Sequence, residues 1–175
     1  HTLVAAAALI AGFSALAAVA EKPNIVFILA DDLGYGDLAC YGHPYAKTPH
    51  IDSLAQHGTR FNRFYATGVT CQPSRVGFLT SRHPRSYTHR IGDFGFRDRK
   101  TIAELLKTNG YATGHFGKWH IGPGVGGKKV SPKIPPESDY GMDEIKINES
   151  LRDGISGRDD PTFEDSIDFI ERHRY

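Results

Sequence analysis

The chain has few cysteines and almost no net charge. Only two of its 175 residues are cysteine, Cys40 and Cys71, which is too few for a disulfide framework, and their separation does not match the ligand spacing of a zinc site. Lysine and arginine number 21 against 20 aspartate and glutamate, a formal net charge of +1. So small a charge excludes the basic field that attracts nucleic acid or an acidic membrane surface. We therefore predict no nucleic-acid partner and no stable membrane partner, and any affinity for anions must come from a local site.

Charged residues are also absent near the start of the chain. Residues 2–20 are apolar and rich in alanine, and they end in Ala18-Val19-Ala20 before Glu21. Because small residues at these positions are typical of a cleavage site, we predict that residues 1–20 are a signal peptide and that the protein is exported, either periplasmic or secreted. No starting Met or basic segment precedes the stretch, so we expect its start to be truncated. An uncleaved membrane anchor is the alternative, because the stretch is almost long enough to span a bilayer.

The rest of the chain alternates strand patterns with helix patterns. The continuous apolar run NIVFILA at 24–30 predicts a strand buried on both faces, as in a parallel sheet. Further strands are predicted at 59–67 and 111–116. Helices are predicted between Thr48 and Gly58, at 73–81, behind the capping box of Thr101 and Glu104, and at 162–172 behind a Thr162 cap. This order predicts an α/β fold with a mixed, largely parallel sheet between helices. The many Gly, Pro and Lys residues at 122–136 predict an exposed loop.

Polar residues follow two of the predicted strands. Asp31 and Asp32 come directly after the strand at 24–30, at the edge where α/β sheets bind ligands. Such a pair often only caps a helix or faces solvent, but as metal ligands its oxygens favour calcium or magnesium over zinc. Lys118 and His120 follow the strand at 111–116 and would project the same way from an extended segment. The alternative is a surface charge beside a histidine satisfied by its neighbours.

Cys71 stands just before the predicted helix at 73–81, where backbone N–H groups and the helix dipole favour an anion. Taken alone, it could be a small buried residue, a thiolate nucleophile or a modification site. It could also pair with Cys40 in a disulfide after export. Arg75, four residues on, could reach across the first helical turn towards residue 71.

The run Cys71-Gln72-Pro73-Ser74-Arg75, followed by Leu79-Thr80, resembles the first signature of the type I, formylglycine-dependent sulfatases. Residues 110–122, which contain Gly117-Lys118-Trp119-His120, resemble the second. Similarity extends to 24–34 and 48–52, and more faintly to 140–143 and the helix from Thr162. One departure is Ser81, where the family usually has Gly. The resemblance implies the alkaline-phosphatase-like fold, with residues 21–175 as the N-terminal part of the catalytic domain.

The resemblance also implies a cofactor chemistry. In the family, the cysteine at the position of Cys71 is oxidised by a formylglycine-generating enzyme to 3-oxoalanine (formylglycine), whose aldehyde hydrates to a diol. One diol oxygen attacks sulfur and expels the alcohol, and the other then loses its proton, which releases sulfate and restores the aldehyde. By similarity, Asp31 and Asp32 ligate Ca²⁺, with Mg²⁺ less expected, together with the modified residue 71.

The remaining site residues are assigned by similarity too. Arg75 would hold the diol, Lys118 would contact sulfate and the nucleophile, and His120 would orient or deprotonate the diol. Fixed cations suit a transition state whose negative charge spreads over sulfuryl oxygens. The resemblance thus implies hydrolysis of a sulfate ester on a carbohydrate or aryl alcohol, with a sulfated small molecule or polysaccharide as substrate.

Two other functions stay open from the sequence. A phosphonate monoester or phosphodiester hydrolase of the same superfamily could use formylglycine on phosphorus. A binding domain without catalysis is the other, because the family's later Asp-Asn metal pair, a further His and a further Lys would lie beyond Tyr175. We expect the fragment alone to be inactive.

Overall fold

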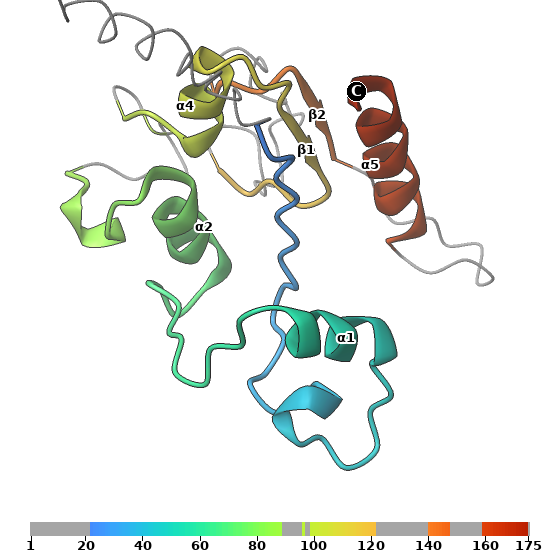
Figure 1. The fold of residues 1–175 in the computed structure, drawn as a ribbon. Helices are drawn as coiled ribbons and strands as arrows, with labels where there is room; N and C mark the ends of the chain where they lie inside the picture. The colour runs from blue at the N-terminus through green and yellow to red at the C-terminus, as the bar shows by residue number, and fades with distance from the viewer. Residues whose placement is uncertain (1–21, 89–95, 97–98, 122–139, 148–158, 175) are drawn as a thin grey trace, which may run out of the picture. The chain divides into compact units, whose positions relative to one another are not determined.

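The computed structural model describes residues 22–88, 96, 99–121, 140–147 and 159–174 (Figure 1). The chain divides into two compact units, His1–Asp31 and Asp32–Tyr175. The predicted signal peptide at 1–20 and the predicted loop at 122–136 lie outside the described residues. Within the described ranges, no helix has the length and apolar character needed to cross a membrane.

Two of the predicted strands are not formed. Residues 24–30 have no regular secondary structure, and the side chains from Ile25 to Leu29 are 44–70% exposed. Residues 59–67 also form no strand, and Phe61, Phe64 and Tyr65 are 61–80% exposed. Both predictions are wrong for this structure. An apolar or alternating pattern makes a strand only when a neighbouring strand supplies backbone hydrogen bonds.

Helix α1 spans Pro49–His57, with Thr48 as the N-cap residue, Pro at the helix start and Gly58 as the C-cap. The predicted limits are confirmed, but the Thr48 side chain does not cap the helix. Its hydroxyl accepts a hydrogen bond from Ala39 N and donates one to Asp52 Oδ1. The same Asp52 oxygen accepts Cys40 N at 2.9 Å. The side chains therefore fasten the 3₁₀ turn Ala39–Tyr41 to α1.

Helix α2 spans Cys71–Thr80 and begins two residues before the predicted start. Its first turn is anchored to the preceding loop, because Ser74 Oγ donates to Gly68 O at 2.8 Å. Gly77 lies so close to this loop that a Cβ there would come within 2.0 Å of Thr67 Oγ1. The helix ends at Ser81, whose φ of 53° is left-handed.

Helix α4 spans Ile102–Thr108, and the predicted capping box is confirmed. Thr101 Oγ1 accepts Glu104 N at 3.1 Å, and Glu104 Oε2 accepts Thr101 N at 2.6 Å. The Thr101 hydroxyl is fully buried and donates its hydrogen to Tyr140 O at 2.7 Å. The cap therefore also joins α4 to the segment that leads into the second strand.

The sheet has two parallel strands, β1 (Gly114–Phe116) and β2 (Glu144–Lys146). β1 lies inside the predicted strand at 111–116, whereas β2 was not predicted. The entry to the sheet is fixed by Asp143, whose Oδ2 accepts Thr113 N at 2.9 Å. Lys107 of α4 pairs with the other carboxylate oxygen at 2.5 Å. These contacts set the register of β1 and β2.

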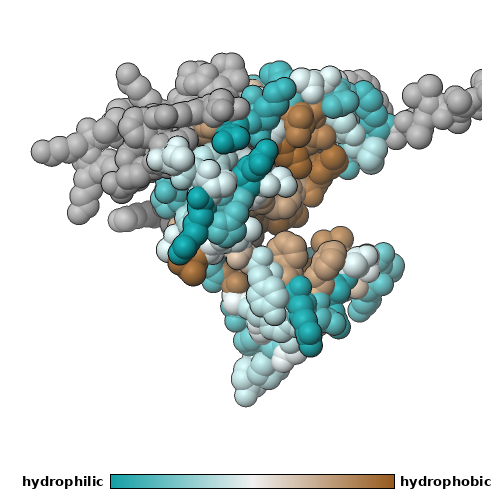
Figure 2. Space-filling view, turned by 90° about the vertical axis from the view of Figure 1, so that its left-hand side faces the viewer, coloured by the Kyte–Doolittle hydropathy of each residue, from teal (hydrophilic) through white to brown (hydrophobic). Residues whose placement is uncertain are grey.

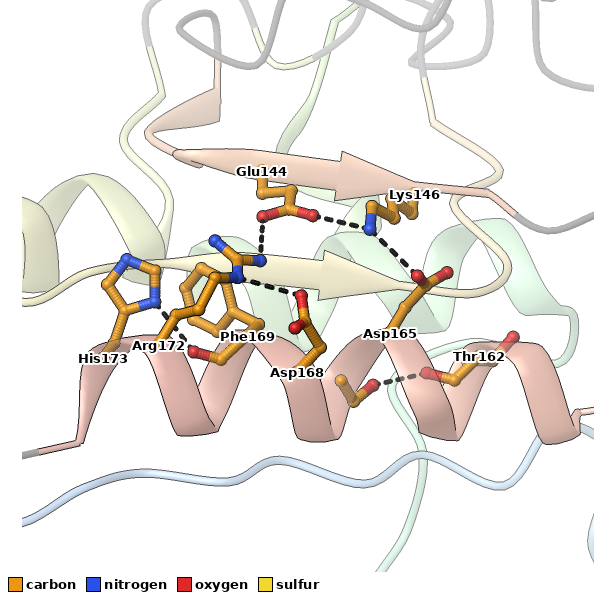
Figure 3. A network of polar contacts seen from close by, with 9 residues as sticks. Glu144, Lys146, Thr162, Asp165, Asp168, Phe169, Arg172 and His173 are labelled. Carbon is orange, nitrogen blue, oxygen red and sulfur yellow. Dashed lines mark hydrogen bonds and ion pairs between the residues drawn. The ribbon is translucent and has the colours of Figure 1, made fainter.

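Helix α5 spans Asp160–His173 and lies alongside the sheet (Figures 1 and 3). Its N-cap is Asp159, so the predicted cap at Thr162 is wrong; Pro161 at the helix start replaces that signal. Ion pairs connect α5 to β2: Arg172 Nη2 with Glu144 at 2.8 Å, and Lys146 Nζ with Asp165 at 2.9 Å (Figure 3).

The buried apolar core lies in the second unit and gathers side chains from α2, α4, β2 and the segments beside them. Its members are Val76, Leu79, Phe96, Ala103, Trp119, Ile121, Tyr140, Met142 and Ile145. Large apolar residues also remain at the surface, as the brown areas of Figure 2 show. The α/β class with a parallel sheet and helices is confirmed.

The left-handed backbone of Ser81 explains why related sequences usually have Gly at this position, and it yields a stability prediction. A left-handed residue at a helix C-terminus favours Gly, because a Cβ clashes with the following carbonyl. We expect Ser81→Gly to raise the free energy of unfolding of the full-length protein by about 1 kcal/mol, measured by urea denaturation. Ser86→Gly is the matched control, since Ser86 is exposed and is not among the left-handed residues. Equal effects of the two substitutions would contradict the explanation.

The Asp143 clamp predicts a loss of stability in acid. Desolvation raises the pKa of Asp143, but the hydrogen bonds from Lys107 and Thr113 outweigh it and leave the pKa below its usual value. A depressed carboxyl pKa stabilises the fold above the unfolded pKa of about 4, and this stabilisation disappears as the pH falls through the folded pKa. We expect Asp143→Asn to be less stable than wild type at neutral pH and the difference to shrink at about pH 3. A urea midpoint difference that stays constant with pH would refute this.

Candidate active site

Cys71 is the first residue of α2, and its side chain is half-buried. Both cysteines are free, so the alternative disulfide between Cys40 and Cys71 is not formed. The first N–H groups of a ten-residue helix such as α2 have no partner within the helix and carry a partial positive charge. Residue 71 therefore lies where an anionic group is stabilised.

Arg75 lies one helical turn after Cys71, on the same face of α2. It is only 5% exposed, and its Nη1 donates a hydrogen bond to the main-chain carbonyl of Lys118. A guanidinium is a permanent cation. The contact therefore holds a positive charge one turn into α2. The contact also joins the two predicted site segments, which are 43 residues apart in sequence.

The segment after β1 turns sharply. Gly117 has φ 97° and His120 has φ 61°, both left-handed. Trp119 and Ile121 between and after them are buried, Lys118 is exposed and His120 is half-buried. His120 is not extended, so the expected extended segment does not continue through it. That the side chains of Lys118 and His120 project the same way stays a prediction.

His120 carries a backbone conformation that few residues other than Gly adopt. Such strain persists only where the surrounding structure enforces it, and it is frequent at functional sites. Here the two neighbours of His120 in sequence, Trp119 and Ile121, are buried at 1% and 0% exposure. The main-chain bond from Gly117 N to Lys146 O at 2.8 Å fixes the start of the turn to β2.

His115, on β1, belongs to the same arrangement and was missed by the sequence analysis. Its Nε2 lies 3.2 Å from Lys118 O, the carbonyl that also accepts Arg75. Desolvation by burial, with a contribution from the positive charge of Arg75, lowers the pKa of His115 to about 4. No sequence pattern distinguishes this histidine, apart from its place three residues before Lys118.

Asp31 and Asp32 form a turn after residues 24–30, and both side chains are exposed. Asp32 has φ 60°, another left-handed residue at a predicted site position. Asp31 closes the first compact unit and Asp32 opens the second. No group of three or more His, Cys, Asp or Glu suited to a metal ion occurs among the residues that the structure describes. The metal set of Asp31, Asp32 and residue 71 stays a prediction.

The two signature segments, joined at Lys118, lie within the match to a known family. The family model described as Sulfatase matches residues 23–172. The chain belongs to the sulfatase family. This confirms the family resemblance, and with it the α/β fold of which the chain forms part.

Individual sulfatases show how much of the molecule is covered. The chain is 48% identical to human arylsulfatase A over 122 residues, which cover 66% of this chain and 24% of that protein. It is 44% identical to an N-acetylgalactosamine-6-O-sulfatase of Bacteroides thetaiotaomicron over 129 residues, which cover 67% of this chain and 24% of the relative. The chain thus spans about a quarter of the length of these sulfatases.

A solved structure agrees with the fold. The structure of BT4656 in complex with its substrate, D-glucosamine-2-N,6-O-disulfate, matches with a TM-score of 0.66 and 25% sequence identity. The match covers 89% of this chain and 32% of that one. The partial sheet and its helices therefore correspond to part of a larger α/β domain.

The buried contact of Arg75 gives a stability prediction. Arg75→Met removes a charged donor from the Lys118 carbonyl and should lower the free energy of unfolding by about 2 kcal/mol. Arg85→Met is the matched control, because Arg85 is exposed on the turn Pro84–Ser86 and should change stability by no more than about 0.5 kcal/mol. Urea denaturation of both variants provides the measurement. If Arg75→Met were as stable as Arg85→Met, Arg75 would not join the two segments.

Proposed function

We propose that the full-length protein hydrolyses a sulfate ester on a carbohydrate or an aryl alcohol, with residue 71 as the source of its nucleophile. The observation that carries the proposal is the hydrogen bond from Arg75 to the Lys118 carbonyl. It brings the helix that starts at Cys71 together with the turn that bears Lys118 and His120. Family membership over residues 23–172 supports the same reaction class.

The residues present fit the two groups that the family implies. Cys71 has a free thiol at the accessible start of α2, as conversion to formylglycine requires, and a formylglycine-generating enzyme is the proposed partner for that step. The exposed carboxylates of Asp31 and Asp32 are hard oxygen ligands, which suit Ca²⁺ better than zinc and, with residue 71, would hold it. When bound, the metal would polarise the nucleophilic oxygen, and the aldehyde would supply that oxygen as its hydrate.

The chain's own cations would act on the sulfuryl oxygens. Arg75 is held in one position by its carbonyl contact, so its charge needs no reorganisation as negative charge develops. The exposed Lys118 side chain extends from a turn whose backbone is fixed, and it would contact sulfate directly. His120, held in its left-handed conformation, would move a proton at the oxygen borne by residue 71.

The substrate proposal rests on the relatives. One acts on N-acetylgalactosamine 6-O-sulfate by its name, and the solved structure holds a sulfated glucosamine. A sulfated small molecule or polysaccharide is therefore the proposed substrate. The alanine-rich stretch at 2–20 supports export to the periplasm or the medium, where such polysaccharides are accessible.

The role of residue 71 can be tested by kinetics on the full-length protein. Cys71→Ala should lower kcat for an aryl sulfate at least about a thousandfold, because it removes the only route to the nucleophile. Cys40→Ala is the matched control: Cys40 is the other cysteine, outside the proposed site, and should keep wild-type turnover. Cys71→Ala with the activity of Cys40→Ala would refute the proposal.

An assay on two ester classes separates the proposal from its nearest rival. Purified wild-type protein is given an aryl sulfate and an aryl phosphate diester in parallel. The proposal predicts the higher kcat/KM for the sulfate. Faster turnover of the diester would identify a phosphodiesterase of the same superfamily instead.

A further inference from the structure

We infer that His115 is a positioning residue of the candidate site: its Nε2–H holds the main-chain carbonyl of Lys118 beside Arg75 and thereby fixes the turn that bears Lys118 and His120. The reaction that this positioning serves is the one proposed above, so the inference rests on the proposed function. His115 itself touches neither residue 71 nor substrate in this account.

Two side chains contact the main-chain carbonyl oxygen of Lys118. The oxygen accepts Nη1 of Arg75 from helix α2 and lies 3.2 Å from Nε2 of His115 on strand β1. A carbonyl oxygen has two lone pairs and can only accept, so both hydrogen bonds fit and Nε2 must carry the hydrogen. The carbonyl is therefore fixed from the helix and from the sheet at once.

The imidazole is itself held in place. Its ring meets the ring of Trp119 edge to face, with centroids 4.9 Å apart and an angle of 77°. Trp119 is 1% exposed and makes a second edge-to-face contact with Tyr140, also at 4.9 Å. The backbone of His115 is paired with Ile145 of β2. The packing of the ring and the strand pairing therefore hold Nε2 in position beside the Lys118 carbonyl.

The neutral form of the imidazole suits this role. Burial, with a contribution from Arg75, lowers the pKa of His115 to about 4. The groups that face the ring are the guanidinium of Arg75 from α2, the main chain of Lys118 and Gly117 after β1, and the ring of Trp119. A second cation beside Arg75 would be repelled, whereas a neutral Nε2–H supplies the same hydrogen bond without charge. We expect His115 to donate unchanged over the whole working pH range.

Two substitutions separate the donor from the bulk of the side chain. His115→Gln places an amide N–H at nearly the position of Nε2 and cannot be charged. His115→Phe keeps an aromatic ring against Trp119 but has no donor. His57→Phe is the matched control, because His57 also contacts a main-chain carbonyl, Ser53 O at 2.8 Å, but does so on exposed α1.

The kinetic test uses the full-length protein and the ester that the wild type hydrolyses, sulfate or phosphate diester. His115→Phe should lower kcat about three- to tenfold with KM within about twofold, because misplacement costs more in the transition state than in binding. His115→Gln should restore kcat to within about twofold of wild type and keep its pH profile. His57→Phe should leave kcat unchanged. Because the assay follows whichever ester is cleaved, the inference is tested even if the sulfatase proposal fails.

Three kinetic outcomes would overturn the inference. Equal kcat in His115→Phe and wild type, even with a lower melting temperature, would make His115 a packing residue only. Equal loss of kcat in the Phe and Gln variants would show that the Nε2–H hydrogen bond does not position the turn. An ionisation missing from the pH profile of the Gln variant would make His115 a general acid or base.

Histidine-selective ¹⁵N NMR of the full-length protein tests the contact without activity. The His115 signal, assigned by its loss in His115→Gln, should report the neutral Nε2–H tautomer at every pH above about 5. A signal that titrates near the unperturbed histidine value of about 6.5, or that reports the Nδ1–H tautomer, would overturn the inference.

Discussion

The candidate site depends on one hydrogen bond, from the buried guanidinium of Arg75 to the main-chain carbonyl of Lys118. Burying a charged donor costs free energy unless the donor makes a hydrogen bond. Here the acceptor for the buried Arg75 is a main-chain oxygen 43 residues away in sequence. The bond therefore fixes two things together: the cation one turn into α2 and the turn that follows β1. It links the helix that starts at Cys71 to the segment that bears Lys118 and His120.

The surrounding fold serves to hold this bond in place. The Lys118 turn is bounded by buried Trp119 and Ile121, and β1 before it is paired with β2. The carboxylate of Asp143 fixes the entry of the sheet through Thr113. Ion pairs of Glu144 and Lys146 connect β2 to α5. Buried side chains thus flank the left-handed residue His120, while polar contacts join the strands to each other and to α5.

Local signals were read correctly from the sequence, and signals that need a distant partner were not. The Thr101 capping box and the proline start of α1 are confirmed, since each is decided within one helical turn. The strands expected at 24–30 and 59–67 are absent, because a strand also needs a neighbour to pair with. The left-handed backbone of His120 was likewise not predicted from the sequence. Recognition of the family came from short motifs, whereas His115 contributes through a contact that no motif records.

We propose that residue 71 acts as a modified cysteine and not as a free thiol, at the start of the helix that Arg75 joins to the Lys118 carbonyl. Mass spectrometry of the tryptic peptide 64–75 from protein purified from its native host tests this claim directly. The account predicts the aldehyde of formylglycine, or its hydrate, at position 71. A peptide that carries only the unmodified cysteine thiol would contradict it.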